Sequence, residues 1–274
     1  RADRLHGARL RLPGPSVGAT ENAMLAACAA EGETVITNAA REPEIEDLQR
    51  FLCAAGAKIS GAGTPEIAVA GLSPRAVTEH RVMPDRIAAA TYLCAAAAAG
   101  GDVLLTDAVP AHIETVCAVL RQMGCAVVAG SSSVRLRRSG AMRACRPVVT
   151  KPYPGFPTDL QQPMMAYLTT ASGQSTINET IFENRFNHVR ELRRMGASIS
   201  VKDNRLARVK GVKELHGADI YASDLRAGAS LIIAGLMANG TTNVHNIEYI
   251  DRGYEYLDSK FRGIGASIER VTKA

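Results

Sequence analysis

Apolar and small residues group along the chain in an order that recurs four times. The first marker of this recurrence is an apolar residue, a glycine four places later and then a short β-rich run. It occurs in segments 52–59, 120–127, 192–199 and 261–268, with glycines at 56, 124, 196 and 265. Each segment predicts a helix end, a left-handed glycine at C′ and a strand. The glycines are 68, 72 and 69 residues apart, which predicts four copies of one structural unit.

A second marker has the same period. Four glycines each close a helix rich in Ala or Leu, namely Gly32, Gly101, Gly173 and Gly240. Each precedes a short β-rich run, and these runs are Thr34–Thr37, Val103–Thr106, Ser175–Asn178 and Thr242–His245. Because the two markers are independent, chance agreement between them is improbable.

Within each copy the predicted order is strand, small-residue helix, strand, amphipathic helix and a strand hairpin, a βαβαββ unit. The second helices carry apolar residues at helical spacing, as at Ile45, Leu48, Phe51 and Leu52. The runs Glu66–Val69 and Val134–Leu136 are predicted hairpin strands. Copy four reaches residues 271–274 after its first hairpin strand, so its last strand is expected to be absent or supplied from elsewhere.

A turn-rich stretch from Gly71 to Pro84 predicts the domain boundary. Residues 1–83 then hold one copy, and residues 84–274 hold three. In the second part, Ala88–Ala90 and Ala95–Ala99 allow helices to approach closely, so small-residue helices are expected in the middle and strands outside. The open edge of copy four is expected to be unpaired or to pair with another copy of the chain, since open edges invite pairing.

Composition narrows the class of protein. The chain has 274 residues, 46% of them hydrophobic and 22% charged, and no apolar run long enough to span a bilayer, so a globular α/β protein of two domains is expected. The net charge of +5 is scattered, and aromatic residues make up 4% without any Trp, which argues against a nucleic-acid-binding groove. Small anionic ligands fit this charge better. The first residues show no signal-peptide pattern, so a cytoplasmic location is expected.

The cysteines indicate neither disulfides nor a metal site. Six are present, without a CxxC pair and mostly within apolar segments, the pattern of buried free thiols in a reducing compartment. The six histidines are dispersed without ligand spacing, so no metal is expected. Cys145 alone is flanked by arginines that could lower its pKa, but its place between copies two and three favours a structural role.

Six segments carry a resemblance to a known family. In chain order they are PSVGATEN (15–22), AREPEI (40–45), FPTDLQ (156–161), FENRF (182–186), SDLRA (223–227) and IDRGYE (250–255). Together they resemble the bacterial UDP-N-acetylglucosamine enolpyruvyl transferases, the 1-carboxyvinyltransferases, and the resemblance covers essentially the whole chain.

The resemblance implies a fold of two domains, each of three βαβαββ units arranged as an inside-out α/β barrel, with substrates between the domains. Residues 1–83 would be the last unit of the amino-terminal substrate domain, and residues 84–274 the carboxy-terminal domain. In the family the extreme amino terminus completes the second domain, which would account for the absent strand of copy four. The chain is therefore expected to be the carboxy-terminal part, about two thirds, of such an enzyme.

The implied reaction moves an enolpyruvyl group from phosphoenolpyruvate to the 3′-hydroxyl of UDP-N-acetylglucosamine in peptidoglycan precursor synthesis, without metal or redox cofactor. Asp159 matches the family residue that contacts this hydroxyl and is its proposed base. Because Pro163 follows soon after, the helix is expected to start no earlier than about Asp159. From the sequence alone, a helix cap is as good an interpretation of Asp159 as a catalytic base.

Two arginines match family residues that contact phosphoenolpyruvate. Arg226 and Arg252 could grip a carboxylate or phosphate in bidentate fashion. Each follows an aspartate at a predicted helix start, Asp224 and Asp251, so a local ion pair or cap is the alternative interpretation. Asp224 is also expected among the substrate-binding residues. Arg185, between a predicted strand and helix, matches a family position near the cleft.

The sugar nucleotide has its own expected contacts. Pro15, Ser16, Val17 and Gly18 lie where the chain enters a helix, and in the family this stretch lines the uridine diphosphate site. Alternatively, Ser16 only caps the helix and Gly18 only permits close packing. The backbone at the position of Ile181 holds the sugar nucleotide in the family. Gly14 departs from relatives that carry a lysine there.

The family's mobile loop with a proton-donating cysteine does not appear in the chain, so the chain by itself is expected to be inactive.

Two alternative functions remain open from the sequence. A related enzyme, 3-phosphoshikimate 1-carboxyvinyltransferase, shares the repeat and the cofactor-free chemistry, although its typical motifs are lacking. The other alternative is a non-catalytic repeat module that binds sugar nucleotides weakly.

Overall fold

A computed structural model describes residues 3–72 and 79–271 of the chain. The chain divides into two compact units, one of Arg1–Met83 with Pro152–Pro154, the other of Pro84–Lys151 with Gly155–Ala274. Each unit has its own hydrophobic core. Residues 73–78, within the predicted boundary stretch, and residues 272–274 lie outside the described residues.

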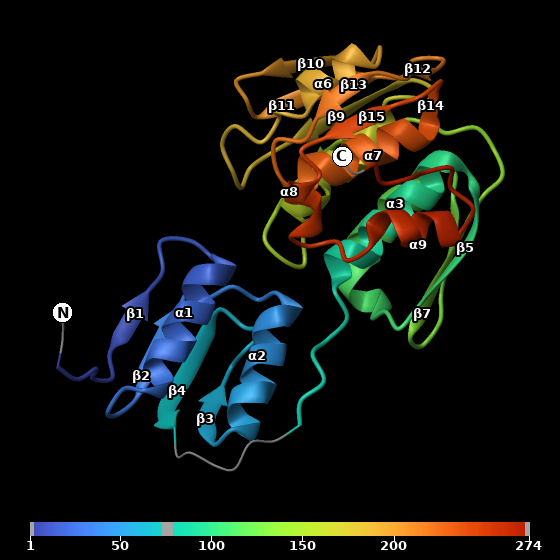
Figure 1. The fold of residues 1–274 in the computed structure, drawn as a ribbon. Helices are drawn as coiled ribbons and strands as arrows, with labels where there is room; N and C mark the ends of the chain where they lie inside the picture. Colours follow the sequence, from blue (N-terminus) through green and yellow to red (C-terminus); the bar gives the residue numbers. More distant parts are fainter. Residues whose placement is uncertain (1–2, 73–78, 272–274) are drawn as a thin grey trace. The chain divides into compact units, whose positions relative to one another are not determined.

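The first unit is one βαβαββ copy. Its elements are β1 (Arg9–Arg11), α1 (Val17–Cys28), β2 (Thr34–Thr37), α2 (Pro43–Ala54), β3 (Ala57–Ser60) and β4 (Glu66–Leu72). The sheet order is β1-β2-β4-β3, with β1 and β2 parallel and β4 antiparallel to both of its neighbours. Helices α1 and α2 lie side by side against this sheet (Figure 1), and Met24, Ile36 and Ile67 are fully buried between them. Phe51, expected in the buried stripe of α2, is instead 43% exposed.

Copy two opens the second unit. Its elements are α3 (Arg86–Ala99), β5 (Gly101–Thr106), the 3-10 helix η1 (Pro110–Ile113), α4 (Glu114–Gln122), β6 (Ala126–Ala129) and β7 (Ser133–Arg138). The sheet is antiparallel in the order β5-β7-β6. Residues 79–85, directly before α3, form no strand, and the rest of the segment where the leading strand of this copy is predicted lies outside the described residues. His80 and Met83 instead bond to Asp47 of α2, at 3.2 and 3.4 Å, which keeps this segment with the first unit.

Copy three is complete. Its elements are β8 (Val148–Val149), the 3-10 helix η2 (Thr158–Leu160), α5 (Gln161–Leu168), β9 (Gln174–Asn178), α6 (Val189–Arg194), β10 (Ser198–Lys202) and β11 (Leu206–Lys210). The sheet order is β10-β11-β9-β8, with only β8 and β9 parallel. This order repeats that of the first unit, as expected for copies of one unit.

Copy four departs from the pattern. Its elements are β12 (Leu215–His216), β13 (Asp219–Tyr221), α7 (Leu225–Met237), β14 (Ala238–Asn239), β15 (Asn243–His245), α8 (Glu248–Asp251) and α9 (Leu257–Gly263). Two short parallel pairs, β12 with β14 and β13 with β15, replace one pair of strands. The strand predicted after Gly265 does not form among residues up to Val271, because no described segment pairs with it.

The helices α3, α5 and α7 pack against one another within one core, and the strands form separate sheets around them. Small residues permit this packing, since Ala90, Ala97, Ala166 and Ala229 are at most 1% exposed. All eight residues of α5 are buried, as expected for a helix surrounded by other elements. The predicted α/β class of repeated units with inner helices and outer strands is confirmed.

The glycine markers explain how each copy turns from helix to strand. All eight marker glycines have φ between +91° and +151°, a region that residues with a Cβ rarely adopt. The prediction of a left-handed glycine after each helix is therefore confirmed in all four copies.

Candidate active site

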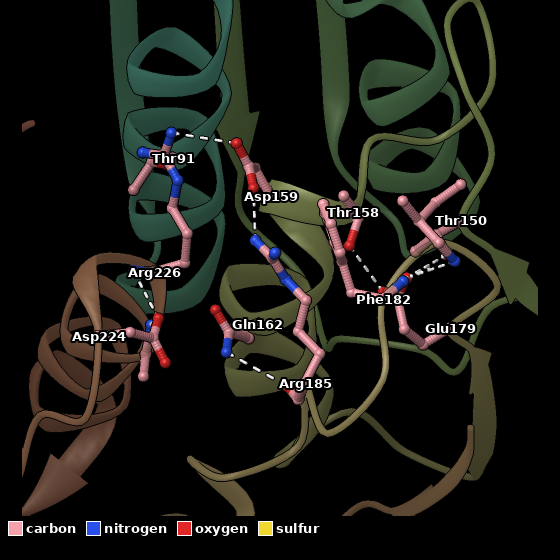
Figure 2. Close-up of polar contacts among 12 residues, drawn as sticks. Thr91, Thr150, Thr158, Asp159, Gln162, Glu179, Phe182, Arg185, Asp224 and Arg226 are labelled. Atoms are coloured by element: carbon pink, nitrogen blue, oxygen red, sulfur yellow. Dashed lines mark hydrogen bonds and ion pairs between the residues drawn. The ribbon is translucent and has the colours of Figure 1, made fainter. Parts of the chain in front are cut away.

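Asp159 lies at the centre of a charged cluster in the second unit. It belongs to η2, so the expectation that the helix begins no earlier than about this residue is confirmed. Its Oδ1 accepts a hydrogen bond from Arg185 Nη2, and its Oδ2 accepts one from Arg226 Nη2 at 3.2 Å (Figure 2). Neither η2 nor α5 has a side-chain cap, so Asp159 does not cap a helix. Three separate segments thus meet at one carboxylate.

Arg226, in the first turn of α7, is held by a second buried group. Its Nη1 donates to the Tyr254 hydroxyl at 3.1 Å, and that hydroxyl lies 2.9 Å from Thr91 Oγ1. Because Thr91 already donates its proton to the Ile87 carbonyl at 2.8 Å, Tyr254 is the donor to Thr91. Burial raises the pKa of Tyr254 against the opposing effect of Arg226, so the phenol remains a donor at neutral pH.

Asp224 serves as a local cap. Its Oδ1 accepts from the backbone N–H groups of Arg226 and Ala227 at 3.0 and 2.8 Å and so fixes the first turn of α7. Arg226 pairs with the distant Asp159 rather than with this neighbour. The alternative of a local ion pair therefore does not apply to Arg226.

Arg185 lies in the loop between β9 and α6, as predicted. Its guanidinium lies 5.0 Å from the centre of the Phe182 ring, and its carbonyl accepts from Gln162 Nε2 at 3.2 Å. Ile181 lies in the same loop. The Ile181 N–H donates to the Glu179 carboxylate at 2.9 Å, so its carbonyl is the backbone group left for a ligand.

Arg252 follows α8, and no hydrogen bond or ion pair among the described residues joins it to Asp159. Asp251 ends α8 instead of starting a helix, because this short helix begins three residues earlier than expected, and it pairs with Arg270 at 2.7 Å. Among the described residues Arg252 has no carboxylate partner, and its guanidinium lies 5.3 Å from the centre of the Tyr249 ring. Its charge is therefore available for an anion.

Pro15, Ser16, Val17 and Gly18 lie in the first unit, at the start of α1. Ser16 caps this helix, since its Oγ accepts from the Ala19 N–H at 3.3 Å. A Cβ built on Gly18 would meet nothing within 4 Å, so close packing does not explain this glycine. Open space beside a capped helix start leaves room for an anionic group.

The thiols and histidines give no sign of a second reactive centre. All six cysteines are free, and burial raises the pKa of the Cys145 thiol despite the neighbouring arginines. In residues 3–72 and 79–271, no three His, Cys, Asp or Glu side chains gather as metal ligands. No helix in the same residues is long and apolar enough to cross a membrane.

Two residues with contacts in the cluster had no predicted role. Tyr254 belongs to the IDRGYE segment, and Glu179 directly follows β9, between Asn178 and Thr180. A pocket of about 840 Å³ lies beside the cluster and is lined by Ser223 and Tyr249, but by none of the residues that bond to Asp159.

Comparisons with known proteins show which family the chain belongs to. The profile of the family described as EPSP synthase (3-phosphoshikimate 1-carboxyvinyltransferase) matches residues 1–261. The UDP-N-acetylglucosamine 1-carboxyvinyltransferase of Finegoldia magna is 49% identical over 271 residues, 98% of this chain and 64% of that protein. The protein of the same name from Nitratidesulfovibrio vulgaris is 50% identical over 272 residues, 99% of this chain and 65% of that protein. The chain thus spans less than two thirds of these relatives.

Solved structures share the fold. The enolpyruvyl transferase NikO from Streptomyces tendae has a TM-score of 0.82 at 27% identity, over 98% of this chain and 66% of that chain. EPSP synthase from Acinetobacter baumannii has a TM-score of 0.73 at 22% identity, over 97% and 64%. The family profile matches nearly the whole chain, relatives are about 50% identical in sequence, and the fold is shared. We conclude that the chain belongs to the EPSP synthase (3-phosphoshikimate 1-carboxyvinyltransferase) family of enolpyruvyl transferases.

Proposed function

We propose that the protein containing this chain transfers the enolpyruvyl group of phosphoenolpyruvate to the 3′-hydroxyl of UDP-N-acetylglucosamine, a step in making peptidoglycan precursors. The observation that carries the proposal is the identity of about half, over nearly the whole chain, with relatives named for this acceptor. The activity is proposed for the whole protein, because the chain spans about 64% of those relatives.

Asp159 is the proposed base. A carboxylate offers about four lone-pair sites, and two are taken by Arg185 and Arg226, which leaves space for a substrate hydroxyl. As the hydroxyl oxygen bonds to C2 of phosphoenolpyruvate, its proton passes to Asp159 while C3 gains a proton, which gives a tetrahedral ketal. Loss of a proton from C3 and of phosphate from C2 then restores the double bond.

The proposed anion contacts are two arginines. Arg226 has its orientation fixed by Asp159 and Tyr254, and Arg252 has no carboxylate partner among the described residues. Guanidinium groups hold carboxylate or phosphate in a fixed geometry, which suits a small doubly charged substrate such as phosphoenolpyruvate.

Each unit has its own proposed sugar-nucleotide contacts. In the second unit they are the Ile181 carbonyl, Arg185 and Asp224, which lie on the segments that meet at Asp159. In the first unit they are the residues of the α1 start, Pro15, Ser16, Val17 and Gly18, where the N–H groups of Val17 and Gly18 and the helix dipole favour a diphosphate.

The test is a phosphate-release assay on the whole protein with phosphoenolpyruvate and either acceptor. We expect inorganic phosphate to appear with UDP-N-acetylglucosamine and not with shikimate-3-phosphate. Turnover with shikimate-3-phosphate alone would favour the related enzyme, and binding of UDP-N-acetylglucosamine without turnover would favour a non-catalytic module. The expectation that residues 1–274 alone are inactive stays a prediction, which the same assay on this chain checks.

A further inference from the structure

Glu179 is a fully buried carboxylate whose hydrogen-bond partners are all uncharged. Its Oε1 accepts from Thr150 Oγ1 at 3.0 Å and from the N–H groups of Ile181 and Phe182 at 2.9 and 3.1 Å. Its Oε2 accepts from Thr158 Oγ1 at 2.8 Å. Figure 2 shows these bonds converging on one side chain between the two loops of the site.

A carboxylate in this position is costly unless every donor around it is used. Glu is almost never fully buried without a partner, and a buried polar group that lacks hydrogen bonds costs about 1–3 kcal/mol. Here two backbone N–H groups and two hydroxyls share one acceptor. Removing the carboxylate would therefore leave four buried or half-buried donors without this partner.

Three of the four donors belong to the segments that carry the site. Thr158 directly precedes Asp159, while Ile181 and Phe182 form the loop whose ring lies beneath Arg185. Oε2 therefore holds the lead-in of α5, and Oε1 holds the loop after β9. One side chain sets the distance between the two.

We propose that Glu179 is a positioning residue that fixes Asp159 relative to the Ile181 carbonyl, and hence the base relative to the bound sugar. The inference rests on the proposed function for its substrate, and on the hydrogen bonds of Glu179 for its mechanism. Glu179 touches neither substrate nor reacting atoms. It acts through the two loops, and misplacement of about 1 Å at such a site can cost about 10²-fold in rate.

The geometry predicts opposite outcomes for two substitutions. In Glu179→Gln the amide oxygen can keep the two backbone N–H groups, and the amide NH₂ can donate to Thr158, whose hydroxyl rotates to accept. In Glu179→Met the size is retained and every acceptor is lost. Glu179→Gln should therefore keep the positions of the two loops, and Glu179→Met should lose them. A requirement for side-chain volume alone would predict no difference between the two variants.

A matched control separates positioning from general stability. Glu191, on α6, is also a buried carboxylate that accepts from a backbone N–H, that of Tyr221 at 3.3 Å, but its ion pair is with Arg194 and it holds neither loop of the site. Glu191→Met should lower the melting temperature and leave both KM values unchanged. If Glu179→Met does not fold, Thr158→Val removes only the bond to Oε2.

Steady-state kinetics of the whole protein are the first test. Glu179→Met should raise KM for UDP-N-acetylglucosamine and lower kcat, each by about tenfold or more. KM for phosphoenolpyruvate should rise much less, because Arg226 keeps its bond to Tyr254 when Asp159 moves. Thr158→Val should lower kcat alone. Wild-type values for Glu179→Met, or equal effects on both KM values, would overturn the inference and leave the proposed function standing.

Amide hydrogen exchange on residues 1–274 is the second test and needs no turnover. The N–H groups of Ile181 and Phe182 should exchange faster in Glu179→Met and at the wild-type rate in Glu179→Gln. If the wild-type protein fails to turn over the proposed substrates, the proposed function fails, and the exchange rates alone decide the inference. Unchanged exchange in Glu179→Met would overturn it.

Discussion

Replacing Tyr254 by Phe removes a single hydroxyl from a residue that is 2% exposed. The ring stays in place, so neither a cavity nor a packing change is introduced. Two hydrogen bonds are lost, from Arg226 Nη1 at 3.1 Å and to Thr91 Oγ1 at 2.9 Å. Thr91 keeps its own bond to the Ile87 carbonyl, so the main loss falls on Arg226.

The expected size of the effect follows from the charge and burial of Arg226. A hydrogen bond to a charged group contributes about 1.5–3 kcal/mol. The Arg226 side chain is 16% exposed and keeps its bond to Asp159, so water replaces part of the loss and about 2 kcal/mol is expected. For a unit of this size, each kcal/mol lowers the melting temperature by about 2–4 °C, so a decrease of about 4–8 °C follows.

The assay is thermal and urea unfolding of residues 1–274, followed by far-ultraviolet circular dichroism. The urea midpoint should fall with an unchanged slope, because the exposed surface does not change. Tyr249→Phe is the matched control, since the Tyr249 hydroxyl has no hydrogen-bond partner among the described residues and only its ring meets Arg252. A Tyr254→Phe melting temperature within about 1 °C of wild type, or an equal loss in both variants, would refute the reasoning.

Three further predictions follow from the site. Asp159→Ala should lower kcat by about 10²- to 10⁴-fold in phosphate release and leave UDP-N-acetylglucosamine binding, measured by calorimetry, nearly unchanged; near-normal turnover would exclude it as the base. Arg252→Ala should raise KM for phosphoenolpyruvate by about tenfold or more, and an equal rise for the sugar nucleotide would contradict its assignment. Burial lowers the pKa of His188, the residue directly before α6, to about 3. Between about pH 6.5 and 3 the unfolded chain therefore binds a proton that the folded chain does not. The free energy of unfolding should fall as the pH falls through this range. Urea unfolding at pH 7 and 5 should show a loss of about 1–2 kcal/mol that His188→Gln abolishes, and an identical loss in that variant would disprove its origin.

The repeat was predictable from the sequence because its markers are local. A glycine such as Gly56 or Gly196 is required by the backbone conformation at that position, whatever lies around it. Strands are different, because a strand forms only where a partner is present. In the described segment before α3, His80 and Met83 bond to Asp47 and no strand forms. The segment after Gly265 finds no partner among the described residues, so the strand predicted there was wrong.

The charged residues of the site could be predicted from the sequence, but the residues that hold them in position could not. The family resemblance named Asp159, Arg185 and Arg226, and the structure brings these three together. Tyr254 acts through Arg226, and Glu179 reaches the lead-in of α5 through Thr158, both more than twenty positions away in sequence, and no spacing rule indicates which distant group will reach them. An acidic residue directly after a half-buried strand and before Thr180 was the one available signal for Glu179.

The uncapped start of α5 has a consequence for how such proteins acquire chemistry. In copies one, two and four, the small-residue helix is capped by the residue sixteen places before the glycine that closes it. These caps are Ser16, Asp85 and Asp224, counted from Gly32, Gly101 and Gly240. In copy three the same place holds Pro157, which has no side chain that can cap, and the carboxylate two residues later turns to the arginines instead.

Copy three therefore forgoes a cap that stabilises a helix by about 1 kcal/mol. Copies two, three and four share one hydrophobic core, and packing in that core offsets the lost capping energy. A repeated scaffold therefore tolerates an uncapped helix that a single copy would not. Residues that agree across all copies identify the architecture of such a protein. The copy that breaks the agreement identifies its reactive group.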